Sequence, residues 1–98
     1  MKAAVIDQPG GRDPILIREV DIPQPGPGQV LIKVSYCGCN WADTQMREGI
    51  YPHKTTYPLI LGMEVAGEVV DVGPNVSHPQ PGQRITAMVE GGGYANFC

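Results

Sequence analysis

Residues 62–76 read Gly-Met-Glu-Val-Ala-Gly-Glu-Val-Val-Asp-Val-Gly-Pro-Asn-Val, and this stretch decides the fold. The apolar, β-branched run from Glu64 to Val72 predicts a strand. Gly67 lies inside that run, where a glycine is typical of a β-bulge or a tight barrel corner. Gly73-Pro74-Asn75 predicts the turn that ends the strand. The stretch therefore indicates a bent strand in a β-rich protein.

Further short strands are predicted on both sides of this stretch, over residues 2–6, 15–20, 30–36 and 84–89, with the start of one more at 94–98. Alternation in the third of these places Val30, Ile32 and Val34 on one face. The connections are rich in proline and glycine, and the segment 50–60, with Pro52 and Pro58, is predicted to be a loop.

One short helix interrupts the strands. Residues 41–48 are long enough for two helical turns, and Asn40 is a suitable N-cap before them. Asp43, three residues after Asn40, gives a pattern close to a capping box. Gly49 is placed to end the helix. The sequence therefore predicts a helix between the strand that ends near Tyr36 and the loop that follows.

Composition excludes several classes of protein. The chain has 98 residues, with 13 glycines and 10 prolines, 42% hydrophobic and 17% charged residues, and a net charge of −3. A disordered chain needs lower hydrophobicity and a larger net charge. The seven Lys and Arg are scattered, so no basic face for nucleic acid is expected. No apolar run approaches the roughly 20 residues that span a bilayer.

The three cysteines, Cys37, Cys39 and Cys98, are an odd set and do not suggest a disulfide framework. Reduced thiols in a cytoplasmic protein are the simple interpretation. Six short strands with Pro and Gly corners and one helix favour a mainly β, barrel-like antiparallel fold. A chain of this length supports one core and one domain.

The segment 62–76 also resembles the signature of the medium-chain dehydrogenase/reductase superfamily. Gly62, Glu64, Gly67, Gly73 and Val76 stand at the spacing of that signature. The resemblance extends in order through residues 27–34, 38–51, 81–84 and 92–95, and so covers essentially the whole chain. It implies a GroES-like irregular β-barrel, the N-terminal catalytic domain of the family.

Departures from the zinc-dependent members of the superfamily identify the branch. Where those members have a zinc-ligating Cys and His, this chain has Asn40 and Met63. An amide oxygen is a poor zinc ligand and a thioether prefers softer metals. Ala42 replaces the proton-relay hydroxyl, and the four cysteines of a structural zinc lobe are absent. No metal site is therefore expected.

Asn40, followed by Asp43-Thr44 and by Arg47-x-Gly49-x-Tyr51, is similar to the zinc-free quinone oxidoreductases of the zeta-crystallin type. Gln45 departs from that pattern, because several relatives have Tyr there. The resemblance implies hydride transfer from NADPH, or NADH, to a quinone or a conjugated enone. Conjugation spreads the developing negative charge, so hydrogen bonds can stabilise it without a metal.

The resemblance also suggests roles for individual residues. Asn40 is expected to donate a hydrogen bond near the nicotinamide or the acceptor oxygen, and Tyr51 to form a polar aromatic wall. The remaining expected roles are cofactor contact for Asn40, Trp41 and Thr44, cleft lining for Gln45, Tyr51 and Met63, and structural support for Asp43, Glu64 and Gly67.

Plainer interpretations stay open for most of these residues. Asn40 could serve as an N-cap alone or in addition, and Tyr51 and Trp41 could simply pack. Met63 could fill the core. For Asp43 and Glu64 structural support is itself the plainer interpretation, and the functional alternative is an acid/base pair. Cys37 and Cys39, one residue apart on a strand end, are expected to point to opposite faces and not to form a metal pair.

The 98 residues contain no strand–GxGxxG–helix unit, so the dinucleotide-binding domain of the family is expected to lie outside them. The chain is thus expected to be an incomplete GroES-like domain, inactive alone, from a cytoplasmic, homodimeric enzyme. Two alternatives remain: a fragment of a zinc alcohol dehydrogenase, and a non-catalytic barrel module like a co-chaperonin.

Overall fold

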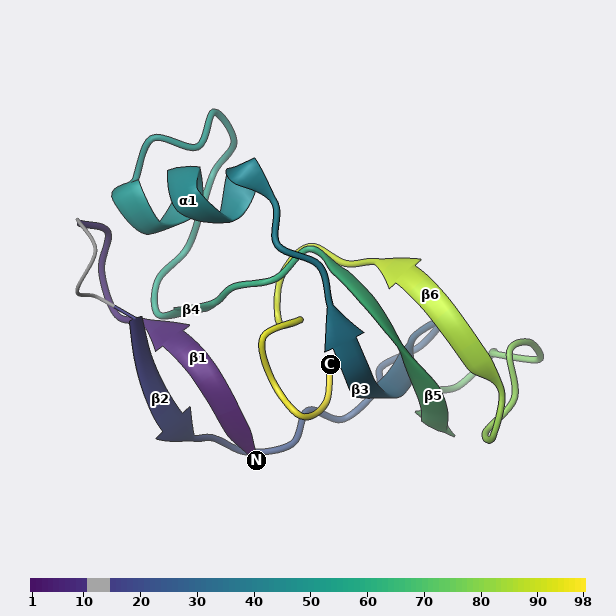
Figure 1. Ribbon diagram of the computed structural model, residues 1–98. Coiled ribbons are helices and arrows are strands. Elements are labelled where there is room, and N and C mark those ends of the chain that lie inside the picture. The colour runs from purple at the N-terminus through teal and green to yellow at the C-terminus, as the bar shows by residue number, and fades with distance from the viewer. Residues whose placement is uncertain (11–14) are drawn as a thin grey trace.

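The computed structural model describes residues 1–10 and 15–98. These residues form six strands and one helix (Figure 1). In chain order the elements are β1 (Lys2–Ile6), β2 (Ile15–Glu19), β3 (Val30–Cys37), α1 (Trp41–Glu48), β4 (Leu59–Ile60), β5 (Glu64–Val72) and β6 (Arg84–Met88). The predicted mainly β fold with one short helix is confirmed.

The strands make two three-stranded antiparallel sheets, with the orders β2-β1-β4 and β3-β5-β6. The first sheet lies beneath α1 and the second extends to the other side of the molecule (Figure 1). The centre of the core is made of Ile6, Met46 and Leu61, which come from β1, α1 and the segment before β5. Burial of these apolar side chains holds the helix against the first sheet.

The C-terminal residues 94–98 connect the two sheets. The N–H of Ala4 in β1 donates to the carbonyl of Tyr94 at 2.8 Å, and the N–H of Ile32 in β3 donates to the carbonyl of Cys98 at 2.7 Å. The segment was expected to begin a strand, but it makes only isolated bridges. It changes partner from one sheet to the other within five residues, so no continuous ladder can form on either side.

The segment 50–60, predicted to be a loop, ends in the short strand β4. Leu59 and Ile60 pair with Ile6 and Val5 of β1. Two residues directly after Pro58 carry too little local pattern to indicate a strand. Only the position of β1, far away in the sequence, creates this pairing.

The prediction that side chains alternate strictly between the two faces of β3 is also wrong in part. Leu31 and Ile32 are adjacent, yet both are buried, because the register against β5 shifts between them. A second shift, between Val34 and Tyr36, lies opposite Gly67. Such β-bulges bend and twist the strands, as the sheet of β3, β5 and β6 shows in Figure 1.

Glycine is required at position 67 by close packing. A Cβ atom there would lie 2.2 Å from the carbonyl oxygen of Lys33 and 2.9 Å from a methyl carbon of Ile32. Both distances are far shorter than a van der Waals contact, so β3 and β5 can approach this closely only across a glycine.

Candidate active site at the start of helix α1

The helix α1 begins at Asn40, whose backbone is extended at φ −121° and ψ 153°. The N–H of Asn40 donates to Asp43 Oδ2 at 2.9 Å, and the N–H of Asp43 donates to the carbonyl oxygen of Asn40 at 3.0 Å. The Asp43 carboxylate thus caps the helix from inside its first turn, where a negative charge also suits the helix dipole.

The Asn40 side chain also carries an amide donor that the cap does not use. Its Nδ2 atom is buried and has no hydrogen-bond partner among the residues that the structure describes. A buried amide donor without a partner is costly, by about 1–3 kcal/mol. A water, an ion or a bound molecule can supply the acceptor for such a group.

Asp43 is the one charged side chain classed as buried within residues 1–10 and 15–98, with 5% of its surface exposed. Its carboxylate accepts three hydrogen bonds from three separate segments. Besides the Asn40 N–H, these come from the Gly62 N–H to Oδ1 at 3.2 Å and from the Tyr94 hydroxyl to Oδ2 at 2.9 Å. The carboxylate therefore ties together α1, the segment before β5 and the C-terminal segment.

Tyr94 is a functional candidate that the sequence did not reveal. Burial, together with Cys39 and the Asp43 carboxylate beside its hydroxyl, raises the pKa of Tyr94. The hydroxyl therefore stays protonated and can donate to Asp43 at neutral pH. The motif Gly92-Gly93-Tyr94-Ala95 is visible in the sequence, but nothing local points to a partner 51 residues away.

Gly62 lets the segment before β5 approach Tyr94. Its φ of +101° is in the left-handed region, and a Cβ there would lie 2.6 Å from the Tyr94 nitrogen. The Tyr94 N–H donates to the carbonyl of Leu61 at 2.8 Å, so the two segments are held backbone to backbone. Met63 follows directly, and its position is set by this contact.

A cavity of about 500 Å³ lies beside the helix, and Tyr51 and Met63 both line it. The Tyr51 ring meets the His53 ring edge to face, with 5.3 Å between centroids. Gln45, expected to line the same cleft, is not among its lining residues. The other lining residues are Met46, His53, Lys54, Thr55, Thr56, Leu59 and Glu90.

The two remaining helix residues expected to contact a cofactor lie on the outer part of α1. Trp41 is 77% exposed. The Thr44 hydroxyl donates to the Trp41 carbonyl at 2.6 Å, so its proton is used within the helix and its oxygen remains an acceptor.

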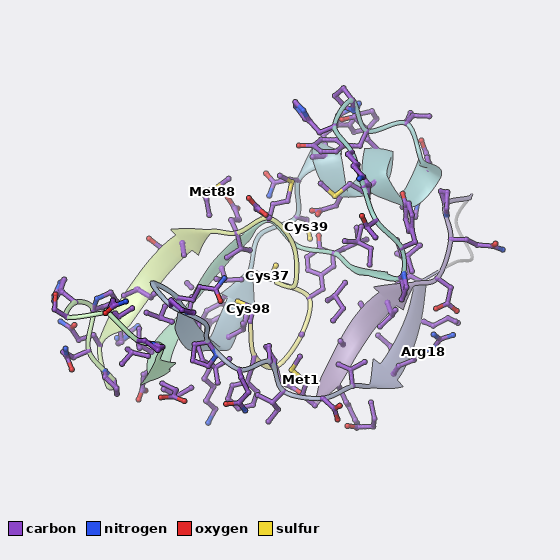
Figure 2. The ribbon with its side chains drawn as sticks, turned by 180° about the vertical axis from the view of Figure 1, so that it is seen from behind. Met1, Arg18, Cys37, Cys39, Met88 and Cys98 are labelled. Carbon is purple, nitrogen blue, oxygen red and sulfur yellow. The ribbon has the colours of Figure 1, made fainter. Side chains whose placement is uncertain are left out.

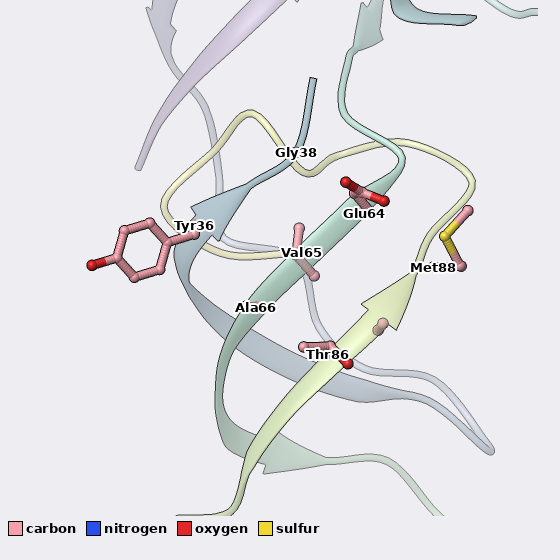
Figure 3. A pocket seen from close by; sticks show the side chains of 8 residues that line it. Tyr36, Gly38, Glu64, Val65, Ala66, Thr86 and Met88 are labelled. Carbon is pink, nitrogen blue, oxygen red and sulfur yellow. The ribbon is translucent and has the colours of Figure 1, made fainter. Parts of the chain in front are cut away.

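Glu64 lies at the start of β5, away from Asp43. It is exposed and its side chain covers Gly38, where a Cβ would lie 1.8 Å from Glu64 Oε1. Figure 3 shows it at one end of a hollow of about 470 Å³ on the sheet of β3, β5 and β6, between Tyr36 and Met88. Asp43 and Glu64 make no contact with each other among the hydrogen bonds of the described residues.

The structure brings no metal site together in the part of the chain that it describes: no group of three His, Cys, Asp or Glu side chains is placed to hold an ion. Cys37, Cys39 and Cys98 are free thiols (Figure 2). Burial, and then the negative charge of Asp43, raise the pKa of Cys37 to about 11. This thiol is therefore protonated, and a weak nucleophile, at neutral pH.

No helix among the described residues is long and apolar enough to span a membrane.

Comparison with known proteins agrees with this geometry. The family model described as "Alcohol dehydrogenase GroES-like domain" matches residues 26–98. The quinone oxidoreductase of Lama guanicoe is 38% identical over 100 residues, covering 100% of this chain and 30% of the relative. The NAD-dependent alcohol dehydrogenase of Sulfolobus acidocaldarius is 42% identical over 81 residues, covering 78% of this chain and 23% of the relative.

Among solved structures, the Escherichia coli quinone oxidoreductase complexed with NADPH superimposes with a TM-score of 0.92 at 28% identity, covering 100% of this chain and 30% of that chain. The chain thus spans no more than about a third of the length of these relatives. The matched residues, the shared fold and the relatives together show that the chain belongs to the alcohol dehydrogenase GroES-like domain family, in the medium-chain dehydrogenase/reductase superfamily.

Proposed function

We propose that this chain is the GroES-like catalytic domain of a zinc-independent, NAD(P)H-dependent reductase that transfers hydride to a quinone or a conjugated enone. The observation that carries the proposal is the buried Nδ2 atom of Asn40, which has no partner among the described residues. It supplies a preorganised donor for an oxygen that becomes negative during the reaction.

The nicotinamide cofactor, bound mainly by a further domain of the enzyme, supplies the hydride. The residues of this chain orient the acceptor and stabilise charge. In this proposal Asn40 Nδ2 donates to the acceptor oxygen. Tyr51 and Met63 line the cavity beside α1 that is available for the rest of the acceptor, and Asn40 is not one of its lining residues. Trp41, exposed at the start of the same helix, is available to contact the cofactor.

The same residues fit zinc poorly. Asn40 and Met63 stand where the resemblance to zinc-dependent members calls for Cys and His. A neutral hydrogen-bond donor and a thioether suit an acceptor whose charge is delocalised by conjugation. They do not replace the Lewis acid that zinc-dependent members of the superfamily place on the alcohol oxygen.

The test uses the full-length enzyme that carries this domain. NADPH oxidation is followed with 1,4-benzoquinone, with a conjugated enone and with ethanol plus NAD⁺, each before and after dialysis against EDTA. We expect turnover with the first two acceptors that EDTA does not change. Asn40→Ala should lower kcat by about 100-fold, the effect of losing one donor to a developing oxyanion.

The matched control is Asn96→Ala, which removes an exposed Asn whose side-chain oxygen accepts from the Lys2 N–H. Its kcat should stay within twofold of the unchanged enzyme. Ethanol oxidation that is lost with EDTA and restored by zinc would overturn the proposal in favour of a zinc alcohol dehydrogenase. Equal kcat values for Asn40→Ala and Asn96→Ala would remove Asn40 from the mechanism.

A further inference from the structure

Tyr94 is held in place by its backbone on two sides and by its hydroxyl on a third. Its N–H donates to the Leu61 carbonyl and its own carbonyl accepts from the Ala4 N–H, both at 2.8 Å. Its ring packs against the core of Ile6, Met46 and Leu61. The ring therefore has little freedom, and its hydroxyl is a fixed donor.

The hydroxyl of Tyr94 and the backbone of Asn40 meet on the same atom. Asp43 Oδ2 accepts from the Tyr94 hydroxyl and from the Asn40 N–H, each at 2.9 Å. The other oxygen, Oδ1, accepts from the Gly62 N–H at the longer distance of 3.2 Å. Two of the three contacts that orient this carboxylate thus lie on the oxygen that holds Asn40.

We propose that Tyr94 is a positioning residue of the hydride-transfer site: its hydroxyl holds the Asp43 carboxylate, and through it the Asn40 backbone, in the one orientation that leaves Asn40 Nδ2 free for the acceptor oxygen. This inference rests on the function proposed above. Without the hydroxyl, Oδ2 keeps a single donor, and the carboxylate can turn away from the helix start.

The state of the hydroxyl supports this role. Because burial and the Asp43 charge raise the pKa of Tyr94, the phenol keeps its proton over the whole range in which the enzyme would work. The hydrogen bond joins the phenol to a carboxylate, and bonds of this charge-assisted kind are stronger than those of an ordinary neutral pair.

The experiment is a double-mutant cycle on kcat/KM in the full-length enzyme, with Tyr94→Phe, Asn40→Ala and both together. Tyr94→Phe keeps the buried ring and removes only the hydroxyl. We expect it to lower kcat/KM by about tenfold. On the Asn40→Ala background it should have no further effect, so the double variant matches Asn40→Ala alone.

The matched control is Tyr57→Phe. Tyr57 is also half-buried and its hydroxyl also donates to α1, to the Met46 carbonyl near the end of the helix. This hydroxyl supports the helix without touching Asp43. The fold-change in kcat/KM of the double variant Tyr57→Phe, Asn40→Ala should equal the product of the two single fold-changes. This is the result expected for two contacts that act independently.

A second readout does not depend on activity. The backbone amide proton of Asn40, observed by NMR, should shift upfield in Tyr94→Phe because its acceptor is no longer held, and should not move in Tyr57→Phe. The positioning role would be overturned if the Tyr94→Phe and Asn40→Ala effects on kcat/KM multiply in the double variant and the chemical shift of the Asn40 amide proton does not change in Tyr94→Phe. The proposed function would then stay intact. An unchanged enzyme that reduces no quinone or enone with NADPH would instead overturn the proposed function, and this role with it.

Discussion

Replacing Asp43 by Asn should destabilise this chain far more than the loss of one charge on its surface would. The carboxylate is buried and accepts from Asn40, Gly62 and Tyr94. An asparagine has one acceptor oxygen, which can serve the two donors now at Oδ2. Its amide group must then face the Gly62 N–H, so that two donors meet in a buried place.

The magnitude follows from these contacts. Hydrogen bonds to a charged group are worth about 1 kcal/mol more than neutral ones, and two bonds lose that advantage. A buried donor without an acceptor costs about 2 kcal/mol. We expect Asp43→Asn to lower the free energy of unfolding by about 3–4 kcal/mol, a large part of the 5–15 kcal/mol of an ordinary domain.

The measurement is urea unfolding at pH 7, followed by far-UV circular dichroism and extrapolated linearly to water. Asp71→Asn is the matched control, because Asp71 is exposed on β5 and its side chain accepts from the N–H of its neighbour Val72. That change should stay within about 0.5 kcal/mol. A loss below 1 kcal/mol for Asp43→Asn would refute the assignment of Asp43 as the residue that joins the three segments.

Two further predictions concern other parts of the chain. Gly67→Ala should lower the free energy of unfolding by about 2–3 kcal/mol, because the new Cβ meets the Lys33 carbonyl at 2.2 Å; urea unfolding measures it. The comparison is Gly26→Ala, where the nearest atom belongs to the flexible Gln29 side chain, and equal losses would contradict the steric argument. Cys37, with its pKa raised to about 11, should react with iodoacetamide at pH 8 more than tenfold more slowly than the exposed Cys39. Because thiolate is the reactive form, the rate at Cys37 should climb as the pH rises toward 11, and peptide mass spectrometry showing equal labelling at pH 8 would count against its burial.

Much of the fold could be predicted because its signals are local. The helix begins after Asn40 and ends before Gly49, as the capping residues indicate, and β1 and β5 have the predicted bounds. The strand β4 and the paired burial of Leu31 and Ile32 could not be predicted. Both depend on which strand lies alongside, and that information is distant in the sequence.

For the candidate site, the sequence by itself determined the chemistry that each position can offer: an amide at Asn40, a thioether at Met63, a carboxylate at Asp43. It also indicated the family. Gly62, Gly67 and Gly73 stand at positions where the backbone leaves no room for a side chain, and the intervals between these positions form a pattern that can be read in the sequence. These properties belong to single residues or to short stretches, and they hold whatever the rest of the chain does.

Only the tertiary structure decided which of these groups act together. It joined Tyr94 to Asp43 across 51 residues, placed Tyr51 and Met63 on one cavity, and left Gln45 outside it. It also left Asn40 Nδ2 without a partner among the described residues, while the Asp43 carboxylate accepts from the Asn40 backbone N–H. The physical reason is that burial and hydrogen-bond pairing depend on distances between segments, and those distances are set by the packing of the whole domain.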